Sequence, residues 1–426
     1  MLSTLRNAWK VPELRKRLIY TLFLIAIFRM GNHIPVPGID TSRLADFAGQ
    51  SGNLINFYDL ISGGAFSTFS IFALGVVPYI NASIIMQLLT IAIPQLEQLS
   101  KEGEDGRRKI QNITRYAAIP IGVLQAYGSF LLIQSQNAIK DASMMNVVMI
   151  ILTLLAASTF LMWLGDMITV KGLGNGVSLI IFVNIISRFP NTIFKISSLK
   201  KGQYIGPVEI AVFVIVALAL LLSVIGMSLA ERRIPVQYAG KSVGNKVFKG
   251  QSSHIPISIT SSAVIAIIFA MSVMQFPFTI GQFWPLSWFN KVIVNGRFSP
   301  FKNNSIMYII FYAVLTIFFT WFYTQVTMKP EEMAENMSKS AGFIPGIRPG
   351  NATARYLERI LDRISIIGGI FAAVIALFPI ILENYTSFKG ISFGGTMLLI
   401  MVGVSLDTLR QMESQLVMRH YQGFLK

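Results

Sequence analysis

Apolar and polar segments alternate along the whole of this 426-residue chain. Apolar runs of about 20 residues, the length that a helix needs to cross a bilayer, recur between polar loops. They predict ten membrane-spanning helices, over residues 18–30, 69–93, 113–133, 145–168, 177–194, 208–229, 257–276, 305–326, 364–382 and 393–409. We therefore expect an all-α polytopic membrane protein.

One apolar segment, residues 54–62, is only about half as long as a membrane-crossing helix. It ends at Gly63 and Gly64, and glycine both disfavours a helix interior and permits a turn. A half-helix cannot expose its backbone ends to lipid, so it must lie inside protein or in a water-filled cavity. This pattern predicts a short re-entrant helix that could stopper a pore. The alternative is a re-entrant or interfacial segment with only a structural role.

Composition supports the membrane assignment, since 53% of residues are hydrophobic and 13% are charged, against about 25% charged in soluble domains. Mean hydropathy is +0.59. The absence of cysteine excludes disulfides, thiol chemistry and cysteine metal sites, and the three histidines are too scattered for a metal cluster. We expect no metal and no cofactor. The net charge of +16 points to basic cytoplasmic loops and anionic partners. The even number of spans, with the excess of Lys and Arg in the loops on one side, predicts both termini in the cytoplasm.

The ten spans divide into an N-terminal half, residues 1–206, and a C-terminal half, residues 207–426. Because each half holds an odd number of spans, we expect the two halves to have inverted topology. Two long loops, residues 230–256 and 327–353, follow the sixth and eighth spans. The first alternates basic with apolar residues, which predicts a folded, protruding hairpin that docks a large anionic partner. The alternative is that these charges only retain topology and contact lipid. The candidate docking residues are Arg232, Arg233, Lys241, Lys246, Lys249 and Arg348.

The spans contain few carboxylates at mid-depth and offer uncharged polar groups such as Gln87, Asn184 and Thr260 instead. Ion- and proton-coupled transporters usually need intramembrane charges, so the pattern favours a passive conduit. The chain has no Walker phosphate loop, no HExxH and no nucleophile elbow, and we expect no enzymatic activity. The competing hypotheses are a secondary transporter for small solutes and a membrane-embedded enzyme.

Several motifs then match a known family in order along the chain. They read KEGEDGRRKIQNITRY, FLMWLGDMITVKGLGNGVSLIIF, RIPVQYA, GFIPGIRPGNATARYL and FGGTMLLI. Together they resemble the SecY family, the central subunits of bacterial protein-conducting channels, from Arg15 to the tenth span. The resemblance implies a ten-helix pore in two inverted halves in the bacterial cytoplasmic membrane. Such a channel translocates unfolded secretory polypeptides, releases transmembrane segments sideways into lipid, and takes its energy from a partner.

The resemblance also implies roles for individual residues. A plug helix would cover about residues 54–66, including Leu54, Ile55, Phe57, Tyr58, Leu60, Ile61, Gly63 and Gly64. A ring of aliphatic side chains would line the constriction: Val76, Ile80, Ile181, Ile268 and Ile400. Ile267 is the alternative to Ile268 in that ring. A lateral gate would lie between the second and seventh spans, with Gln87 and Thr260 as its polar residues.

The partners that the resemblance implies are the SecE and SecG subunits, the SecA motor ATPase and the ribosome. The basic loops, at Lys246 and Arg348 in particular, would dock the motor or the ribosome, including its RNA. Nascent chains with signal sequences would be the substrates, and membrane lipids would surround the channel.

Overall fold

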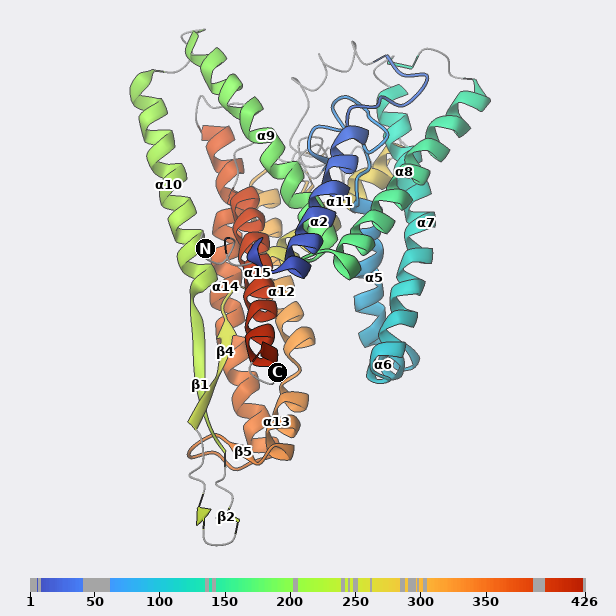
Figure 1. Ribbon diagram of the computed structural model, residues 1–426. Coiled ribbons are helices and arrows are strands. Elements are labelled where there is room, and N and C mark those ends of the chain that lie inside the picture. Colours follow the sequence, from blue (N-terminus) through green and yellow to red (C-terminus); the bar gives the residue numbers. More distant parts are fainter. Residues whose placement is uncertain are drawn as a thin grey trace.

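The computed structural model describes residues 6, 9–40, 62–134, 138–139, 143–201, 206–238, 242–243, 246–247, 252–260, 263–283, 288–289, 296, 299–301, 305–385 and 395–423. Within this part of the chain, each of the ten predicted spans overlaps one helix (Figure 1). In chain order these helices are α2 (Pro12–Gly31), α5 (Val77–Ala92), α7 (Glu104–Gln134), α8 (Met144–Lys171), α9 (Gly176–Lys201), α10 (Pro207–Leu229), α11 (Ala263–Phe283), α12 (Ile306–Met328), α14 (Asn351–Tyr385) and α15 (Gly395–Gly423).

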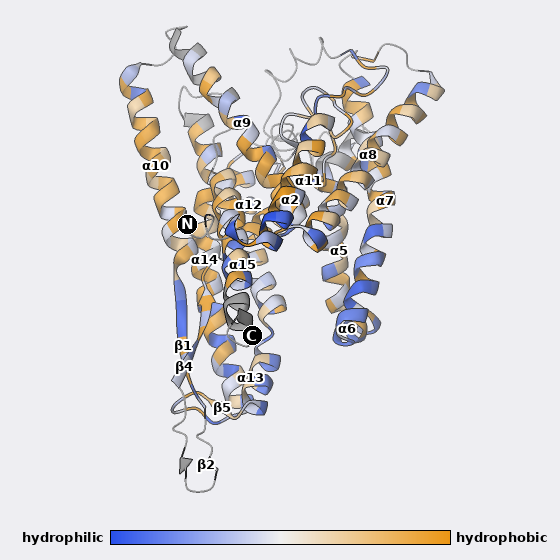
Figure 2. Ribbon diagram, viewed as in Figure 1, coloured by the Kyte–Doolittle hydropathy of each residue, from blue (hydrophilic) through white to orange (hydrophobic). Residues whose placement is uncertain are grey.

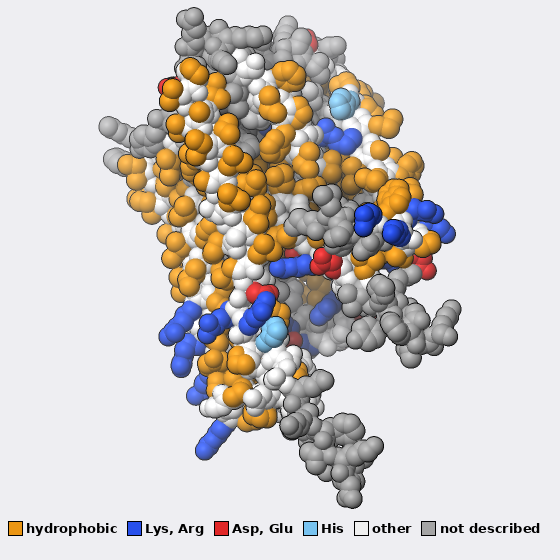
Figure 3. Space-filling view, turned by 60° about the vertical axis from the view of Figure 1, so that its left-hand side comes forward, with side chains coloured by type: hydrophobic (Ala, Val, Ile, Leu, Met, Phe, Trp, Pro, Cys, Tyr) orange, Lys and Arg blue, Asp and Glu red, His pale blue; other side chains and the backbone are white. Residues whose placement is uncertain are grey.

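The helices have the length and hydropathy of a multi-pass membrane protein. Six spans among the described residues are long and apolar enough to cross a bilayer, and α5 would add a seventh together with α6 (Pro94–Lys101), to which it is bent by 99°. Figure 2 shows hydrophobic residues over most of the helical body, and Figure 3 shows them exposed on its surface. α10 buries only Phe213 and Val224 along its length, as expected of a helix that faces lipid or a partner helix. The count of ten spans itself stays a prediction.

Two hydrophobic clusters form the core. The first joins α2, α7, α8 and α9 with residues 65–77, and the second joins α11, α12 and α14. This division largely follows chain order, but Ile84 of α5 belongs to the second cluster. α15 contributes to both clusters, through Ile400 in the first and Leu399 in the second. The C-terminal helix therefore lies at the seam between the two groups of helices.

A small sheet projects beyond the apolar body of this mostly helical fold. β1 (Glu231–Tyr238) pairs antiparallel with β4 (Ser252–Ser258), and β5 (Gly342–Phe343) pairs with the other edge of β1. β2 (Ser242–Val243) and β3 (Lys246–Val247) form a separate short ladder. The protruding hairpin expected for the first long loop is thus confirmed. We call this end of the molecule, with β1, β4, β5 and α13 (Pro330–Lys339), the β-sheet end.

The β-sheet end has its own hydrophobic core. Ile234 and Val236 of β1 and Ile257 of β4 pack on Met337 of α13 and Leu357 of α14. α14 is 35 residues long, which at 1.5 Å per residue is about 52 Å and exceeds the roughly 30 Å of a bilayer core. Its first turns therefore belong to the β-sheet end, and its later turns to the apolar body.

Several predicted boundaries are wrong for identifiable reasons. The second span begins at Val77 rather than at residue 69, because residues 65–76 form turns in which Phe69 has φ +43° and Gly75 φ +56°. Residues 252–258, assigned to the loop's end and the seventh span, are β4, because they pair with β1. The loop expected over residues 94–112 is largely helical, as α6 and the start of α7, because charged residues on an exposed helix are fully solvated.

The ends of three other loops were also predicted wrongly. α9 continues through Pro190 to Lys201, and α11 continues through Pro277 to Phe283, although proline disfavours helix interiors. The second long loop contains α13 and β5, which pack on the core of the β-sheet end. α13 was misread as loop because its sequence is mostly polar and only Ala334 and Met337 are buried.

A small residue, Gly369, lets α14 pack closely against α12. Gly369 of α14 faces α12, where an added Cβ would lie 3.1 Å from the Ile317 Cα and 3.3 Å from the Thr320 Cβ. On α12, Thr316, Thr320 and Thr324 donate their hydroxyl protons to carbonyls one turn earlier, so their polar groups are satisfied while buried. Small residues of this kind let membrane helices approach closely.

Replacing Gly369 by leucine should wedge α12 away from α14. We expect a loss of about 1–3 kcal/mol of stability from overpacking, measured as a lower midpoint of thermal unfolding in detergent. The matched control is Gly226→Leu on α10, where an added Cβ meets nothing within 4 Å. That control should not lose stability, and equal losses in the two variants would contradict the account.

Candidate functional site

Residues 62–76 place non-helical backbone inside the helical body, where each polar group needs a partner. Ser70 N–H donates to the Ala65 carbonyl at 2.8 Å, and Ile71 N–H donates to the Ile34 carbonyl at 2.9 Å. The Phe69 carbonyl accepts from Val36 N–H at 3.1 Å. The segment is thus held by its own turns and by the loop that follows α2. We call it the turn segment.

The far end of the turn segment is fixed to α8. The Ser158 hydroxyl donates to the Gly75 carbonyl at 3.0 Å, and both groups are buried. Phe66, Phe69 and Phe72 fill the space between these contacts, and each is at most 5% exposed. The segment therefore forms part of the first core cluster instead of connecting helices over the surface.

The turn segment begins at a pair of glycines beside two asparagines. Gly63 and Gly64 have φ +68° and +94°, the left-handed region that favours glycine. The Asn32 amide donates to the Asn184 side-chain oxygen at 3.4 Å and to the Ser62 carbonyl at 3.5 Å. A Cβ at Gly63 would collide with the Asn184 side chain. This close approach joins α2 and α9 to the start of the segment.

The apolar half-helix expected before these glycines lies outside the described residues. Its candidate residues there are Leu54, Ile55, Phe57, Tyr58, Leu60 and Ile61. The plug therefore stays a prediction.

The five aliphatic residues predicted to form a ring belong to one cluster. Val76, Ile181 and Ile400 are 1%, 4% and 2% exposed and are members of the first core cluster, and Ile80 and Ile268 are half-buried and pack against it. They come from α5 and its N-cap, α9, α11 and α15. Four helices that are far apart in the sequence thus contribute aliphatic side chains in or against the cluster that also holds the turn segment, and Ile80 packs against the second cluster as well.

Ile267 and Ile268 point to different surroundings. Ile267 is fully buried in the second core cluster, among residues of α12 and α14, whereas Ile268 packs against the first cluster with the other four candidates. The geometry therefore favours Ile268 as the member of this aliphatic group. We call Val76, Ile80, Ile181, Ile268 and Ile400 the aliphatic ring.

A cavity of about 380 Å³ opens near the β-sheet end, and none of the five residues of the aliphatic ring lines it. Asn175, Ser258 and Asp407 give it a polar lining. Val264 and Val404 also line it, and both belong to or pack against the first core cluster. The cavity is thus polar toward the β-sheet end and apolar where it meets the cluster.

A second and larger cavity, of about 1160 Å³, is a groove between two sets of helices. One wall comes from α5, α6 and α7, and the other comes from α12, α13 and α14. α11 contacts α5 and α7 as well as α12 and α14, so it joins the two sets. We call this cavity the groove.

The two predicted gate residues line different cavities. Gln87 of α5 lines the groove, and its buried side-chain oxygen has no hydrogen-bond partner. Thr260 precedes α11, lines the smaller cavity, and donates to the Met227 carbonyl at 3.5 Å. The structure does not bring Gln87 and Thr260 together.

Each wall of the groove is braced by a carboxylate that sequence reasoning did not single out. Asp362 of α14 accepts from Trp321 Nε1 and from Gln325 Nε2 of α12, both at 2.7 Å. Behind the other wall, Asp166 of α8, which does not line the groove, binds Arg115 of the wall helix α7 at 2.8 Å. These charge-assisted bonds tie wall helices to their neighbours on the same side and leave the two walls joined mainly through α11.

The helical pattern of residues 351–364 could have revealed Asp362. Thr353, Leu357, Leu361 and Ile364 are buried at helical spacing, which places Asp362 on the adjoining face of the same helix.

The candidate docking residues are only partly described. Arg232 and Arg233 are exposed on β1, where Arg233 binds Glu231 at 2.8 Å, and Arg348 is exposed before α14. Lys246 lies on β3, and its side chain is outside the described residues, as are Lys241 and Lys249. Lys and Arg side chains gather below the apolar band, toward the β-sheet end (Figure 3). Among the described residues, no group of three His, Asp or Glu could hold a metal ion.

Gly63→Ala should loosen the turn segment more than Gly64→Ala does. Both variants place alanine at positive φ, a strain of roughly 1–2 kcal/mol, but only the Gly63 variant also meets Asn184. We expect faster hydrogen exchange of the amides of residues 65–77 in Gly63→Ala, measured by mass spectrometry. Adding Asn184→Ala should close part of the difference. Equal exchange in Gly63→Ala and Gly64→Ala would show that the asparagine contact does not hold the segment.

Comparisons with known proteins agree with this architecture. The chain aligns over 440 residues with the protein translocase subunit SecY of Thermotoga maritima at 39% identity, covering 100% of this chain and 98% of that one. The SecY subunits of Aquifex aeolicus and Halalkalibacterium halodurans are 40% and 41% identical, with full coverage of both chains.

The fold also matches solved structures. One is described as the structure of a protein conducting channel, with a TM-score of 0.67 and 18% identity. Another is Sec61 in the canine ribosome–channel complex from the endoplasmic reticulum, with a TM-score of 0.60 and 16% identity. Each comparison covers 94% of this chain and 92% of the other. The SecY family profile matches residues 70–409, and the chain belongs to the SecY family.

Proposed function

We propose that this protein is a passive protein-conducting channel that moves unfolded secretory polypeptides across a membrane. The observation that carries the proposal is that aliphatic residues from four helices lie in or pack against one core cluster, and that Val264 and Val404, which line a partly polar cavity, also pack against or belong to it. Such a cavity can admit a hydrated chain, and compliant aliphatic side chains can close around it. When no chain is present, an apolar constriction excludes water and therefore ions.

We further propose that the turn segment anchors a plug formed by about residues 54–66. Its aromatic residues occupy the same cluster as the aliphatic ring, so the chain preceding Gly63 starts beside the constriction. Among the solved structures similar to this chain is one described as showing that the plug domain of SecY stabilises the closed state, with a TM-score of 0.63.

The groove is the proposed lateral exit for transmembrane segments. Its two walls are each braced on their own side, and it opens between the group of helices that holds α5 and the group that holds α12. A hydrophobic segment in the channel could leave by parting these walls. Gln87, with its unsatisfied oxygen, would contribute a polar contact that breaks or forms in that motion.

The β-sheet end is the proposed cytoplasmic docking surface, with both termini on the same side of the bacterial cytoplasmic membrane. Arg232, Arg233 and Arg348 are exposed there, as the binding of an anionic partner requires. The partners would be the SecA motor or a ribosome, which supply the energy, with no catalysis by this chain. The exposed apolar face of α10 offers a surface for lipid or for a SecE or SecG helix.

Single cysteines can test the path of the chain, because the protein has none of its own. A stalled secretory polypeptide carrying one cysteine should form disulfides with Ile268→Cys and Ile400→Cys, and the adducts should require its signal sequence. The readout is the shifted band on a non-reducing gel.

Two matched controls define the result. Ile267→Cys is the adjacent residue but lies in the other core cluster, and Val374→Cys is 60% exposed on the outside of α14. Neither should form an adduct. If Val76→Cys, Ile268→Cys and Ile400→Cys all fail to react, the conduit is wrong and a solute transporter becomes the better hypothesis.

A further inference from the structure

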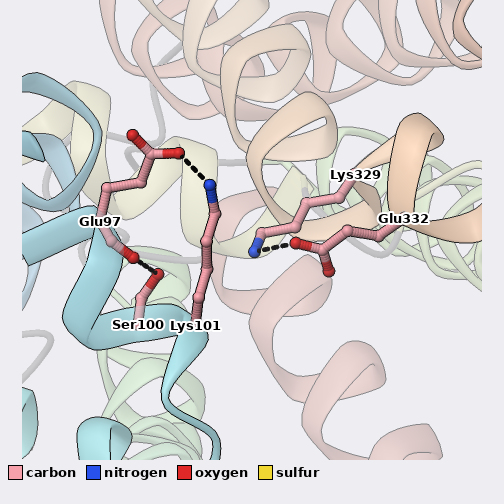
Figure 4. Close-up of polar contacts among 5 residues, drawn as sticks. All are labelled: Glu97, Ser100, Lys101, Lys329 and Glu332. Atoms are coloured by element: carbon pink, nitrogen blue, oxygen red, sulfur yellow. Dashed lines mark hydrogen bonds and ion pairs between the residues drawn. The ribbon is translucent and has the colours of Figure 1, made fainter.

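The mouth of the groove, at the β-sheet end, carries charges on both walls. On one wall, Lys101 Nζ binds Glu97 Oε1 of the same helix, α6, at 2.6 Å. On the other wall, Lys329 Nζ binds Glu332 Oε1 of α13 at 2.7 Å. All four residues line the groove (Figure 4).

The two pairs are close enough to affect each other. The hydrogen bond and charge of Lys101 lower the pKa of Glu97, and the more distant charge of Lys329 lowers it further. In the same way, Glu97 raises the pKa of Lys101, with smaller contributions from Glu332 and Glu331. The neighbour across the groove is therefore of opposite charge in each case.

The walls are also complementary as a whole. The wall of α6 and α7 presents Glu97, Lys101 and Arg107, so positive charge exceeds negative by one. The facing wall presents Lys329, Glu331, Glu332, Arg355 and Glu358, where negative charge exceeds positive by one. The two walls therefore carry net charges of opposite sign, which attract each other across the groove.

In the present structure, these two ion pairs lie within the walls, so the attraction between the walls does not yet form an ion pair across the groove. Figure 4 shows the two lysine ammonium groups between the two carboxylates, and each lysine binds the carboxylate of its own wall rather than that of the facing wall. Lys329 also has φ +41°, a conformation that residues other than glycine rarely adopt, at the junction of α12 and α13. This junction fixes where the lysine side chain leaves the backbone, at the mouth of the groove.

We propose that these two ion pairs form an electrostatic latch at the mouth of the groove. When the walls approach, Glu97 binds Lys329 and Lys101 binds Glu332. When the walls part, each residue returns to the partner on its own wall, as in the present structure. Both states keep every charge paired, so the latch can exchange partners without leaving a charge alone.

Only the biological role of the latch rests on the proposed lateral exit, because the latch would set how readily a transmembrane segment opens the groove. The motion itself can be measured without any substrate. Spin labels at Gln98→Cys on α6 and Ser338→Cys on α13 report the distance between the walls, because both residues are exposed and neither lines the groove.

The test exchanges the charges of one wall at a time in the full chain. Glu97→Lys with Lys101→Glu keeps the composition, the net charge and the pair within α6, but it makes like charges meet across the groove. Lys329→Glu with Glu332→Lys does the same from the other wall. We expect either exchange to increase the ratio of long to short label distances by about two- to fivefold, the range for exposed ion pairs. The two exchanges together should restore the original distribution.

Salt provides an independent readout. The screening length falls from about 10 Å at 0.1 M to about 3 Å at 1 M, so the four proteins should give the same distances at 1 M salt. The latch is wrong if a single exchange leaves the distances unchanged at low salt, if the combined exchange does not restore them, or if the differences persist at 1 M. Normal cysteine adducts in the channel with unchanged label distances would overturn the latch alone. Label distances that respond as expected without any channel adducts would overturn the conduit alone.

Discussion

The structure depends on one constraint, which is that backbone polar groups in an apolar environment must find partners within the protein. Helices satisfy it along their length, and the turn segment, residues 62–76, satisfies it by other means. Its amides and carbonyls bond within its own turns, to the loop after α2 and to Ser158 of α8. The helices of the first core cluster are therefore arranged around this segment. The same cluster holds, or is contacted by, the five residues predicted to form the aliphatic ring.

The same requirement explains why the molecule can contain a seam. On each side of the groove, strong polar contacts such as those of Asp362 and Asp166 hold neighbouring helices. Between the walls, α11 and α15 make contacts that are mainly apolar, with Ile84, Ile268 and Ile400 close to the boundary between the clusters. Apolar contacts are not directional, so they can be exchanged with lipid or with a hydrophobic segment at little cost. Polar contacts are directional and cannot be exchanged with lipid or with a hydrophobic segment in this way.

Much of this could be predicted from the sequence, and the failures have physical causes. Hydropathy located every long helix because the bilayer demands long apolar runs, and the glycines correctly marked a break at residues 63 and 64. Hydropathy failed for residues 65–76, which are as apolar as a span but are buried in protein as turns. It also missed α6, which buries no residue, and α13 and the first turns of α14, where one narrow face is buried. The grouping of Val76, Ile181, Ile268 and Ile400 came from family resemblance, since apolar residues in a ring and in a core look the same in sequence.

α14 runs without interruption from the core of the β-sheet end into the second hydrophobic cluster. Its first turns pack on β1, β4 and α13, and its later turns pack on α11 and α12. A load applied to the exposed hairpin is therefore delivered by one helix of about 52 Å, whose internal proline, Pro379, lies near the far end. Because α12 is clamped to α14 at Gly369 and Asp362, this strut carries α12 with it. A small tilt of the strut at the β-sheet end would become a larger sideways displacement at its far end, so the hairpin has mechanical leverage over one wall of the groove.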